Sequence, residues 1–470
     1  MLRPSAYLVA VFAVGCSTTS APPGTKPIES DGSVVDAVVD AAPVDAPHAS
    51  DDPCRGTALP VDQHYVAAGL CARLVGKVSG ALRQLSFAPN GDLFGVTTAG
   101  AIVRLRDANH DGVFDEAPPE RVEWANTGGN GNNCHVDDGG GYLYAGTVGG
   151  VRRWKWSDAI DAGGAGEDVI VDAPAGGGHG FHTVHVYNDM MYVQVGSEGN
   201  ATDPMSPEYD TSRSLVKRWA LSKFAAGAPL KWADGELVGV GLRNTVGFSR
   251  SASGKVYGVM NGMDNIHYKG DDIHQDNPAD TLVLLSPGAR YGYPFCFSAQ
   301  RVVASGSVIA PGTQLAVDEF PVHDDAWCAT NSTKPLAIFQ AHAAPLDIVF
   351  FDGALPTGGL PSKFRGGAFV SMHGSWDRAP STGYKVVFVP FDADERPAMA
   401  TSTASSTTFP YETVFGGGKA GEPADGAWHW SLGTVSDAPR PVGVAISPID
   451  GALYVSADSS GYVYRIGAVR

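Results

Sequence analysis

Seven segments of the chain stand out between the apolar stretches: six combine Gly with His, Arg, Asn or Asp, the residue types from which a polar reaction or binding site is built, and one, YGYPFC, is aromatic. They are GGGHGFHT (176–183), GLRNTVG (241–247), NGMDN (261–265), GDDIHQDNPADTL (270–282), YGYPFC (291–296), HGSWDRAPSTGY (373–384) and PRPVGV (439–444). A neutral imidazole can accept a proton near neutral pH, and an Arg guanidinium can hold a carboxylate through two hydrogen bonds. Taken together across several of these segments, the Arg residues indicate a binding set for one anionic ligand. By itself, His179 could cap a Gly-rich turn or accept a proton.

The polar segments lie between six blocks that each contain an alternating strand, a turn with Gly or Asn, and a second strand. The blocks begin near residues 82, 134, 181, 246, 347 and 442. Alternation of apolar and polar residues indicates half-buried strands, and six self-similar blocks predict an all-β fold, a six-bladed β-propeller. A pair of β-sandwiches is the alternative, but it requires no such repetition. In a propeller, loops between blades converge at the mouth of the channel, so we expect the site there.

The composition excludes some classes of partner. The 470 residues contain 33 Lys and Arg against 50 Asp and Glu, a net charge of -17, and 59 Gly. Nucleic acids and anionic lipid surfaces are bound by basic surfaces, so neither is an expected partner.

The N-terminus has the form of an export signal. An apolar run from Ala6 to Val14 is too short to span a bilayer and is followed by Gly15 and Cys16. The letters A-V-G-C resemble a bacterial lipobox, so we expect a lipoprotein signal over 1–16 with lipid on Cys16. An ordinary signal with an incidental Cys16 is the alternative. Residues 17–53 are expected to form a disordered acidic tether, and residues 54–470 the propeller. The chain would then be exported and held in the cell envelope, contacting membrane only through its lipid.

The cysteines after Cys16 form an odd set. Export lets disulfides persist, and we favour the bridges Cys54–Cys71 and Cys296–Cys328, which leave Cys134 free. Connectivity is not fixed by sequence alone.

The segment DANHDGVFDE (107–116) reproduces the first half of a calcium loop. Its candidate ligands are Asp107, Asn109, Asp111 and Asp115. The twelfth position is Pro118 rather than the bidentate Glu, which excludes an EF-hand. Two interpretations stay open, a structural Ca²⁺ in a β-hairpin and an ion-free turn rich in Asp, Asn and Gly.

Taken together, the motifs resemble a known family. GLRN-x-VG, DIH-x-DNPAD, YGYP-x-C, HGSW-x-R-x-P-x-x-GYKV and RPVGVA occur in this order over residues 54–470. The set is similar to the glucose/sorbosone dehydrogenase family of pyrroloquinoline quinone (PQQ) enzymes, and most similar to the branch with L-sorbosone dehydrogenase and fungal pyranose dehydrogenases. The resemblance implies a six-bladed propeller that binds PQQ beside a Ca²⁺ ion and oxidises a sugar or polyol.

The resemblance also implies roles for individual residues. His179 matches the general base, and the main-chain oxygens of Gly262 and Met263 match calcium ligands. The residues that match or could supply cofactor contacts are Arg243, Asn244, Arg378, Arg440 and Trp376. Asp264 and Asp280 are acidic neighbours of the calcium site. Two departures from the pattern are His182, where many relatives have Arg, and Thr281, where an acidic residue is common; both put the choice of substrate in doubt.

The resulting expectation is an exported PQQ-dependent dehydrogenase acting on an aldose, a sorbosone-like sugar or a related polyol, by base-assisted hydride transfer to the quinone. Electrons would leave to an external quinone or cytochrome, because the chain has no C-x-x-C-H haem attachment motif. Two alternatives stay open: a non-catalytic carbohydrate- or envelope-binding propeller lipoprotein, and a calcium-dependent propeller lactonase.

Overall fold

The computed structural model describes residues 54, 56–59, 64–137, 139–201, 212–304, 307–353, 359–379, 381–398, 411–417 and 439–469. The expected signal (1–16) and tether (17–53) lie outside the described residues, so both stay predictions.

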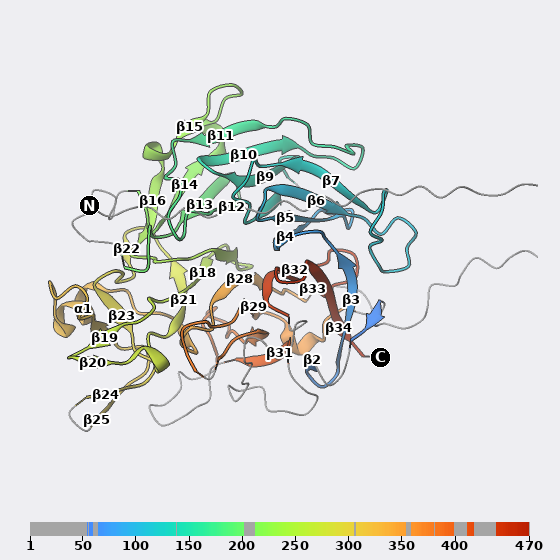
Figure 1. Cartoon of the computed structure of the whole chain (residues 1–470). Helices are drawn as coiled ribbons and strands as arrows, with labels where there is room; N and C mark the ends of the chain where they lie inside the picture. Colours follow the sequence, from blue (N-terminus) through green and yellow to red (C-terminus); the bar gives the residue numbers. More distant parts are fainter. Residues whose placement is uncertain are drawn as a thin grey trace, which may run out of the picture. The chain divides into compact units, whose positions relative to one another are not determined.

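Six mainly antiparallel sheets of four or five strands form the body of the protein (Figure 1). The first blade contains β4 (Leu82–Phe87), β5 (Leu93–Thr97), β6 (Ala101–Leu105) and β7 (Arg121–Asn126). The second contains β8 (Cys134–Asp137), β9 (Tyr142–Thr147), β10 (Gly150–Lys155) and β11 (Glu167–Val171), with β15 (Leu230–Lys231) at its edge. The third contains β12 (His182–Tyr187), β13 (Met190–Val195), β14 (Leu215–Ala220) and β16 (Glu236–Val240), with β22 (Ala289–Arg290) at its edge. Both of these edge strands pair in parallel.

The remaining three blades complete the set. The fourth contains β17 (Gly247–Arg250), β18 (Val256–Met260), β21 (Asp280–Leu285) and β27 (Ala337–Phe339). The fifth contains β28 (Pro345–Phe350), β29 (Ala368–Met372), β30 (Lys385–Val389) and β31 (Glu412–Gly417), with β2 (His64–Val66) at its edge. The sixth contains β32 (Pro441–Ile446), β33 (Leu453–Ala457), β34 (Tyr462–Ala468) and β3 (Leu70–Lys77), with β1 (Thr57–Ala58) at its edge. The six-bladed propeller predicted from the repeated blocks is therefore confirmed.

The first strands of the blades form a closed ring. Each of β4, β8, β12, β17, β28 and β32 contacts the next, and β32 contacts β4. The Gln84 amide on β4 crosses the ring, donating to the carbonyl oxygens of Val246 at 2.9 Å and Leu346 at 2.8 Å. At this level the channel is therefore filled by side chains, which leaves its mouth as the place for a ligand.

Apolar side chains pack between neighbouring sheets. Phe364, Phe369 and Phe388 lie between the fifth and sixth blades with their rings about 5 Å apart, and the side chains of Tyr464 and Ile466 fill the same core. Such edge-to-face packing of large rings supplies much of the burial that a sheet-only fold needs.

Short elements outside the blades extend the loops. They are the hairpins β19 (His267–Tyr268) with β20 (Asp271–Asp272), β23 (Cys296–Ser298) with β26 (Gln314–Ala316), and β24 (Val302–Ala304) with β25 (Ser307–Ile309); the helix α1 (Asp325–Asn331); and the 3₁₀ turns 221–223, 232–234, 274–276 and 362–364. The Asp324 carboxylate caps α1 by accepting from the Trp327 amide at 2.8 Å.

Both preferred disulfides are confirmed. Cys54 is bonded to Cys71, and Cys296 on β23 is bonded to Cys328 on α1, while Cys134 is buried as a free thiol.

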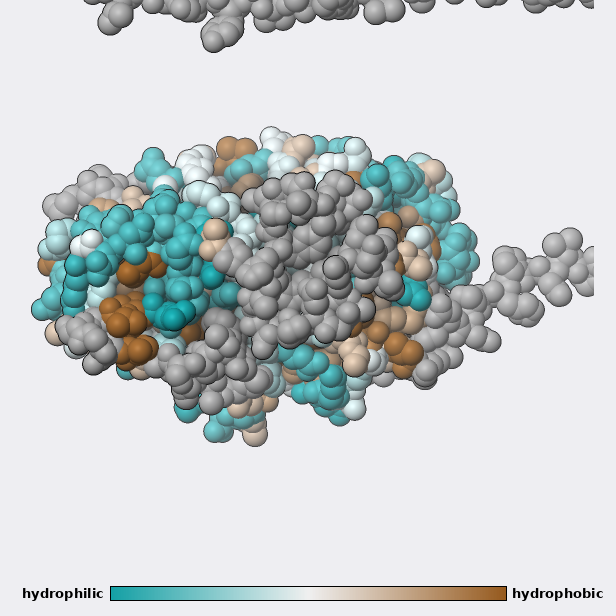
Figure 2. Space-filling model, turned by 60° about the horizontal axis from the view of Figure 1, so that its bottom comes forward, coloured by the Kyte–Doolittle hydropathy of each residue, from teal (hydrophilic) through white to brown (hydrophobic). Residues whose placement is uncertain are grey.

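The described surface carries few large apolar side chains. Figure 2 shows one face, on which hydrophilic residues dominate and hydrophobic ones form small patches. Trp376 is the one aromatic residue among the exposed large hydrophobic side chains of the described chain, with 67% of its surface exposed. Among the described helices, none has the length and apolar character that crossing a bilayer would require.

Closure of the ring generates a prediction about the C-terminus. β3, near the N-terminus, pairs with β34 from Leu70 opposite Ala468 to Lys77 opposite Tyr462. Deleting residues 462–470 removes the partner of both β3 and β33, together with the buried Tyr464 and Ile466, each contributing about 1.5–3 kcal/mol. Since whole domains are stable by only about 5–15 kcal/mol, we expect loss of the cooperative unfolding transition in urea.

A truncation after Ala468 keeps all of β34 and serves as the control. An unchanged urea midpoint in the longer deletion would contradict this account of closure.

Candidate active site

One cavity of about 130 Å³ brings together several of the predicted site residues. It is lined by His179, Arg243, Asn261, Gly262, Asp264, Asp280, His342, Ala344, Gly374, Ser375 and Trp376. His179 lies just before β12, and Arg243 lies between β16 and β17. Residues 261–264 follow β18, and Asp280 is the first residue of β21. His342 and Ala344 lie between β27 and β28, and residues 374–376 follow β29. The loops of the third, fourth and fifth blades therefore meet at one place.

His179 has one ring nitrogen fixed and one available. Its Nδ1 lies 2.8 Å from Oγ of Ser197, and that hydroxyl donates to the carbonyl oxygen of Gly199 at 2.6 Å. The hydroxyl proton is thus already used, so Nδ1 carries the hydrogen and donates to Ser197. In this tautomer Nε2 keeps its lone pair, as a general base requires.

Burial keeps His179 neutral. Removal from water, followed by the positive charge of Arg243, lowers the pKa of His179 to about 4. The imidazole is therefore an unprotonated acceptor at neutral pH.

Small residues allow the loop of His179 to pack. Gly177 has a φ of 78°, a conformation that costs other residues energy. A Cβ on Gly196 would lie 2.6 Å from Cβ of His179, so the neighbouring chain can approach only because this residue is Gly. The Gly-rich sequence around His179 is thus required by the backbone that holds it.

The Arg243 guanidinium is held by acceptors on two residues, Asn200 and Asp264. Its Nε donates to the Asn200 carbonyl oxygen at 3.0 Å, and its Nη2 donates to Oδ1 of Asn200 at 2.9 Å and to Oδ2 of Asp264 at 2.8 Å. The adjacent Asn244 donates to Oδ1 of Asn261 at 3.0 Å. Oδ1 of Asn244 is buried with no hydrogen bond to the described residues. An orphaned buried acceptor of this kind costs stability and is often completed by a ligand.

The turn at Gly262 is braced by a buried carboxyl group. Oδ1 of Asp280 accepts from the Gly262 amide at 2.9 Å, and its Oδ2 accepts from the Ala344 amide at 2.8 Å. Burial raises the pKa of Asp280 to about 6 against the effect of these two amides. The structure therefore gives Asp280 a role in holding the backbone of the turn.

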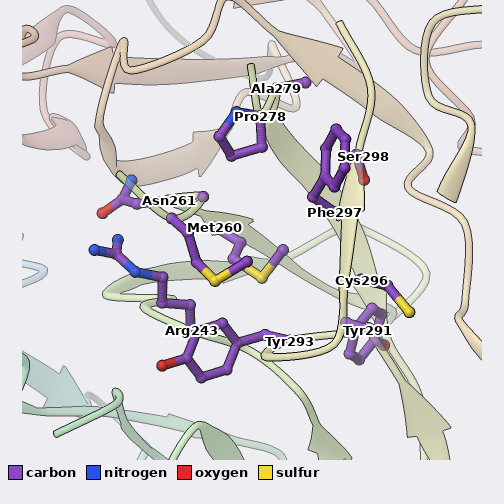
Figure 3. Close-up of a pocket in the computed structure, with 12 residues that line it drawn as sticks. Arg243, Met260, Asn261, Pro278, Ala279, Tyr291, Tyr293, Cys296, Phe297 and Ser298 are labelled. Atoms are coloured by element: carbon purple, nitrogen blue, oxygen red, sulfur yellow. The ribbon is translucent and has the colours of Figure 1, made fainter. Parts of the chain in front are cut away.

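Gly262 and Met263 also border a second, smaller space. Gly262 lines both the main cavity and this second cavity of about 20 Å³, whereas the buried Met263 lines the second cavity and not the main one. Figure 3 shows this smaller space, with Met260, Pro278 and Tyr293 around it and Arg243 at its side. Its size suits a single water molecule at most, so it is the packing behind the turn.

His342 lies between two carboxylates. Its Nε2 is 2.6 Å from the His274 carbonyl oxygen and 3.0 Å from that of Asn277. Its Nδ1 faces Oδ1 of Asp264 at 3.7 Å and Oδ2 of Asp377 at 3.8 Å. Burial lowers the pKa of His342, but the surrounding carboxylates and carbonyls outweigh burial and raise it.

A second polar network lies beside the cavity, between the fifth, sixth and first blades. Arg440 donates through Nη2 to Nδ1 of His373 at 3.0 Å, and His373 Nε2 lies 2.9 Å from Oδ1 of Asp458. Arg83 donates to the other oxygen of Asp458 at 2.9 Å, and its guanidinium lies over the Phe181 ring. With a neutral His373, two Arg and one Asp leave this network with a net positive charge, which suits an anionic ligand.

Arg378 and the two departures lie away from the cavity lining. Arg378 donates to Oδ1 of Asp276 at 3.4 Å. His182 is fully buried in β12, with Nδ1 2.8 Å from the Thr147 carbonyl oxygen, and Thr281 is buried in β21. Of the predicted cofactor residues, Arg243 and Trp376 line the cavity. Asn244 and Arg440 lie next to residues that line it. Arg378 does not line the cavity but belongs to the same loop as Trp376, which does.

Several residues of the site were not predicted from the sequence. His373 lies in the HGSW motif and could have been assigned from it. Ser197, His342 and Asp458 stand singly in loops, and Arg83 occupies an ordinary strand position, so no spacing signal marks them.

The Asp107 loop satisfies its own backbone. Asp107 accepts from the Gly112 amide and Asp111 from the Val113 amide, while the buried Glu120 accepts from the amides of Ala108, Asn109 and Asp115. Calcium binding at this loop stays a prediction.

Comparison with known proteins identifies the family of the chain. A family model described as TrAA12-like matches residues 64–468. The chain belongs to this family. A PQQ-dependent pyranose dehydrogenase of Coprinopsis cinerea is 30% identical over 314 residues, which are 61% of this chain and 39% of that protein. This chain thus spans about two fifths of the length of that relative. A PQQ-dependent sugar dehydrogenase of Hypocrea jecorina is 26% identical over 409 residues, 83% of this chain and 86% of that protein.

Solved structures agree with this family. The holo form of the Coprinopsis cinerea pyranose dehydrogenase PQQ domain superimposes with a TM-score of 0.73 at 25% identity, covering 88% of this chain and 99% of that one. The calcium structure of a Trichoderma reesei carbohydrate-active enzyme of family AA12 gives a TM-score of 0.72 at 23% identity, covering 88% and 99%, which shows the shared fold.

The tautomer and burial of His179 generate a measurable prediction. Burial also lowers the pKa values of His182, His185 and His373. In protein with ¹³C-labelled histidine, we therefore expect several imidazole signals to stay neutral below pH 6, and the one that titrates at about pH 4 to vanish in His179→Gln. Burial and the Arg243 charge are the cause, so Arg243→Gln should raise this pKa. A His179 signal that titrates at the ordinary value near 6.5 would contradict the described geometry.

Proposed function

We propose that this TrAA12-like protein is a PQQ-dependent dehydrogenase of sugars, acting on an aldose, a sorbosone-like sugar or a related polyol. The observation that carries the proposal is the free Nε2 of the neutral His179 in a cavity beside the fixed cation of Arg243. The names of the Coprinopsis and Hypocrea relatives support the cofactor and the class of substrate.

The residues around the cavity fit a polyanionic quinone. PQQ carries three carboxylates, and the described chain offers Arg243 on one side and the cationic network of Arg83 and Arg440 on another. The unpartnered Oδ1 of Asn244 supplies an acceptor. Arg378 would contribute charge from the adjacent loop, and the exposed indole of Trp376 would cover the ligand from the rim. The main-chain oxygens of Gly262 and Met263 would hold Ca²⁺ there, because a hard cation prefers oxygen ligands.

When bound, the quinone would supply the two-electron acceptor for the hydride that leaves the substrate carbon. The protein's own part is proton transfer and orientation. Nε2 of His179 would accept the proton of the substrate hydroxyl, since its lone pair is free and the ring is neutral. The Nδ1–H bond to Ser197 would keep the ring oriented during that transfer, and the nearby Asp264 carboxylate would offset the charge that the imidazole gains.

The cellular setting belongs to the proposal as well. The signal-like N-terminus and the two disulfides support an exported protein held in the cell envelope by lipid on Cys16. An external quinone or cytochrome would then accept the electrons. A calcium structure exists for the Trichoderma neighbour of the same fold, in keeping with the proposed Ca²⁺.

Reconstitution tests the proposed activity. The purified chain, loaded with PQQ and Ca²⁺, should reduce a dye in the presence of a sugar from a panel of aldoses and polyols. His179→Gln should lower kcat at least about 100-fold, the usual contribution of a general base, while the affinity for PQQ, measured by fluorescence, changes less than about threefold.

His267→Gln, which changes an exposed histidine, is the matched control and should retain the activity. Sugar binding with no quinone binding would replace this proposal with the carbohydrate-binding propeller, and lactone hydrolysis without dye reduction would replace it with the lactonase.

The pH dependence follows from the direction of the His179 shift. His179 acts as a base only when its ring is neutral. As far as its titration determines the profile, kcat/KM should be constant above about pH 5 and fall as the pH drops through about 4. A profile recorded with the dye assay checks this, in buffers in which the fold is confirmed by circular dichroism. Loss of activity already between pH 7 and 6 in a folded, loaded protein would contradict the assignment.

A further inference from the structure

His342, at the cavity, has one ring nitrogen that faces two carboxylates across distances longer than an ordinary hydrogen bond. The His342 side chain is only 5% exposed. Its Nε2 lies within hydrogen-bond distance of two carbonyl oxygens, those of His274 and Asn277. Carbonyl oxygens only accept, so Nε2 carries the hydrogen, and Nδ1 of the neutral ring holds a lone pair.

That lone pair faces two negative groups. Nδ1 is 3.7 Å from Oδ1 of Asp264 and 3.8 Å from Oδ2 of Asp377, and the three atoms all lie within 4.8 Å of one another. An N–H···O bond is about 2.7–3.2 Å long, so both gaps are too wide for a shared proton. A divalent cation that bonds to nitrogen and carboxylate oxygen at about 2.0–2.6 Å spans gaps of this size.

Each carboxylate is already oriented by another partner. Oδ2 of Asp264 accepts from Arg243 at 2.8 Å, and the Asp264 amide donates to Oδ1 of Asn200 at 2.7 Å. Oδ2 of Asp377 accepts from the Asn265 amide at 3.0 Å. Outer partners of this kind fix the direction of metal ligands before the ion arrives.

The local charge also calls for a cation. Arg243 contributes one positive charge, and Asp264 and Asp377 contribute two negative charges, so the group needs one more positive charge, either a proton on His342 or a metal ion in its place. Burying an uncompensated charge is costly. Asp264 and His342 line the main cavity, so water could complete the coordination from that side.

We propose that Nδ1 of His342 and the carboxylates of Asp264 and Asp377 bind one divalent metal ion. The mixed nitrogen and oxygen ligands suit an ion of the Mn²⁺ to Zn²⁺ group. This side-chain site is distinct from the main-chain oxygens of Gly262 and Met263 proposed above for Ca²⁺. The ion would fix Asp264, and through it Arg243 and the turn 261–265, and the inference does not depend on the proposed dehydrogenase activity.

Manganese binding to the quinone-free protein tests the site. The full chain is stripped of metal with a chelator, its fold is checked by circular dichroism, and Mn²⁺ is added alone while free ion is followed by electron paramagnetic resonance. We expect a saturable Mn²⁺ site that shows an electron spin-echo modulation from a directly bound ¹⁴N, which separates it from any site built of oxygen ligands alone.

Two variants of the same cavity separate His342 from its surroundings. His342→Gln should remove the ¹⁴N modulation and weaken binding at least about tenfold, as loss of a ligand does. His179→Gln, which changes the other histidine of the cavity, should keep both the modulation and the affinity. If His342→Gln does not fold, Asp377→Asn takes its place and should weaken binding about tenfold with the modulation retained.

The outcomes that overturn the site are specific. Folded protein without saturable Mn²⁺ binding would show that His342 is instead an imidazolium between the two carboxylates. Binding without a ¹⁴N modulation, or a modulation that survives in His342→Gln, would move the ion to other ligands. Because quinone is left out, these outcomes are independent of whether the chain oxidises sugars.

Discussion

The pairing of β3 with β34 is the constraint on which the rest of the structure depends. It joins a strand from near the N-terminus to the last strand of the chain and so closes the ring of six sheets. A closed ring holds the first strands of all blades in mutual contact and makes their connections converge. His179, Arg243 and His342 are far apart in the chain, and the convergence of the loops that connect the blades brings them to one cavity.

Two groups of opposite net charge lie at and beside the cavity, and each is costly to bury without a counter-charge. On one side, His342 is surrounded by the carboxyl groups of Asp264, Asp377 and the buried Asp280, and the positive charge of Arg243 balances only part of their negative charge. In the network around Asp458, Arg83 and Arg440 exceed the single carboxylate. The first group therefore has an excess of negative charge and the second an excess of positive charge. This pattern is expected where a cation and a polyanionic ligand would bind close together.

The sequence predicted the blades better than the site. Alternation and turns located β4 with β5, β12 with β13 and β32 with β33, because strand pairing within a blade is local in sequence. The motifs located His179 and Arg243, whose loops carry distinctive spacings of Gly and Asn. His342 and Asp458 could not be found in this way, because their roles come from contacts with residues 65 and 85 positions away, such as Asn277 and His373. The position of Arg378 beside Asp276 likewise depends on how two loops pack.

Three histidines near one cavity show how the partner of a ring determines its role. Ser197 accepts from Nδ1 of His179 and leaves Nε2 free as a base. Two carbonyls accept from Nε2 of His342 and leave Nδ1 free toward carboxylates. Arg440 donates to Nδ1 of His373, so its Nε2 donates to Asp458 and no nitrogen is left. The same side chain can therefore serve as a base, a ligand or a structural link, since the neighbouring donor or acceptor decides which lone pair remains.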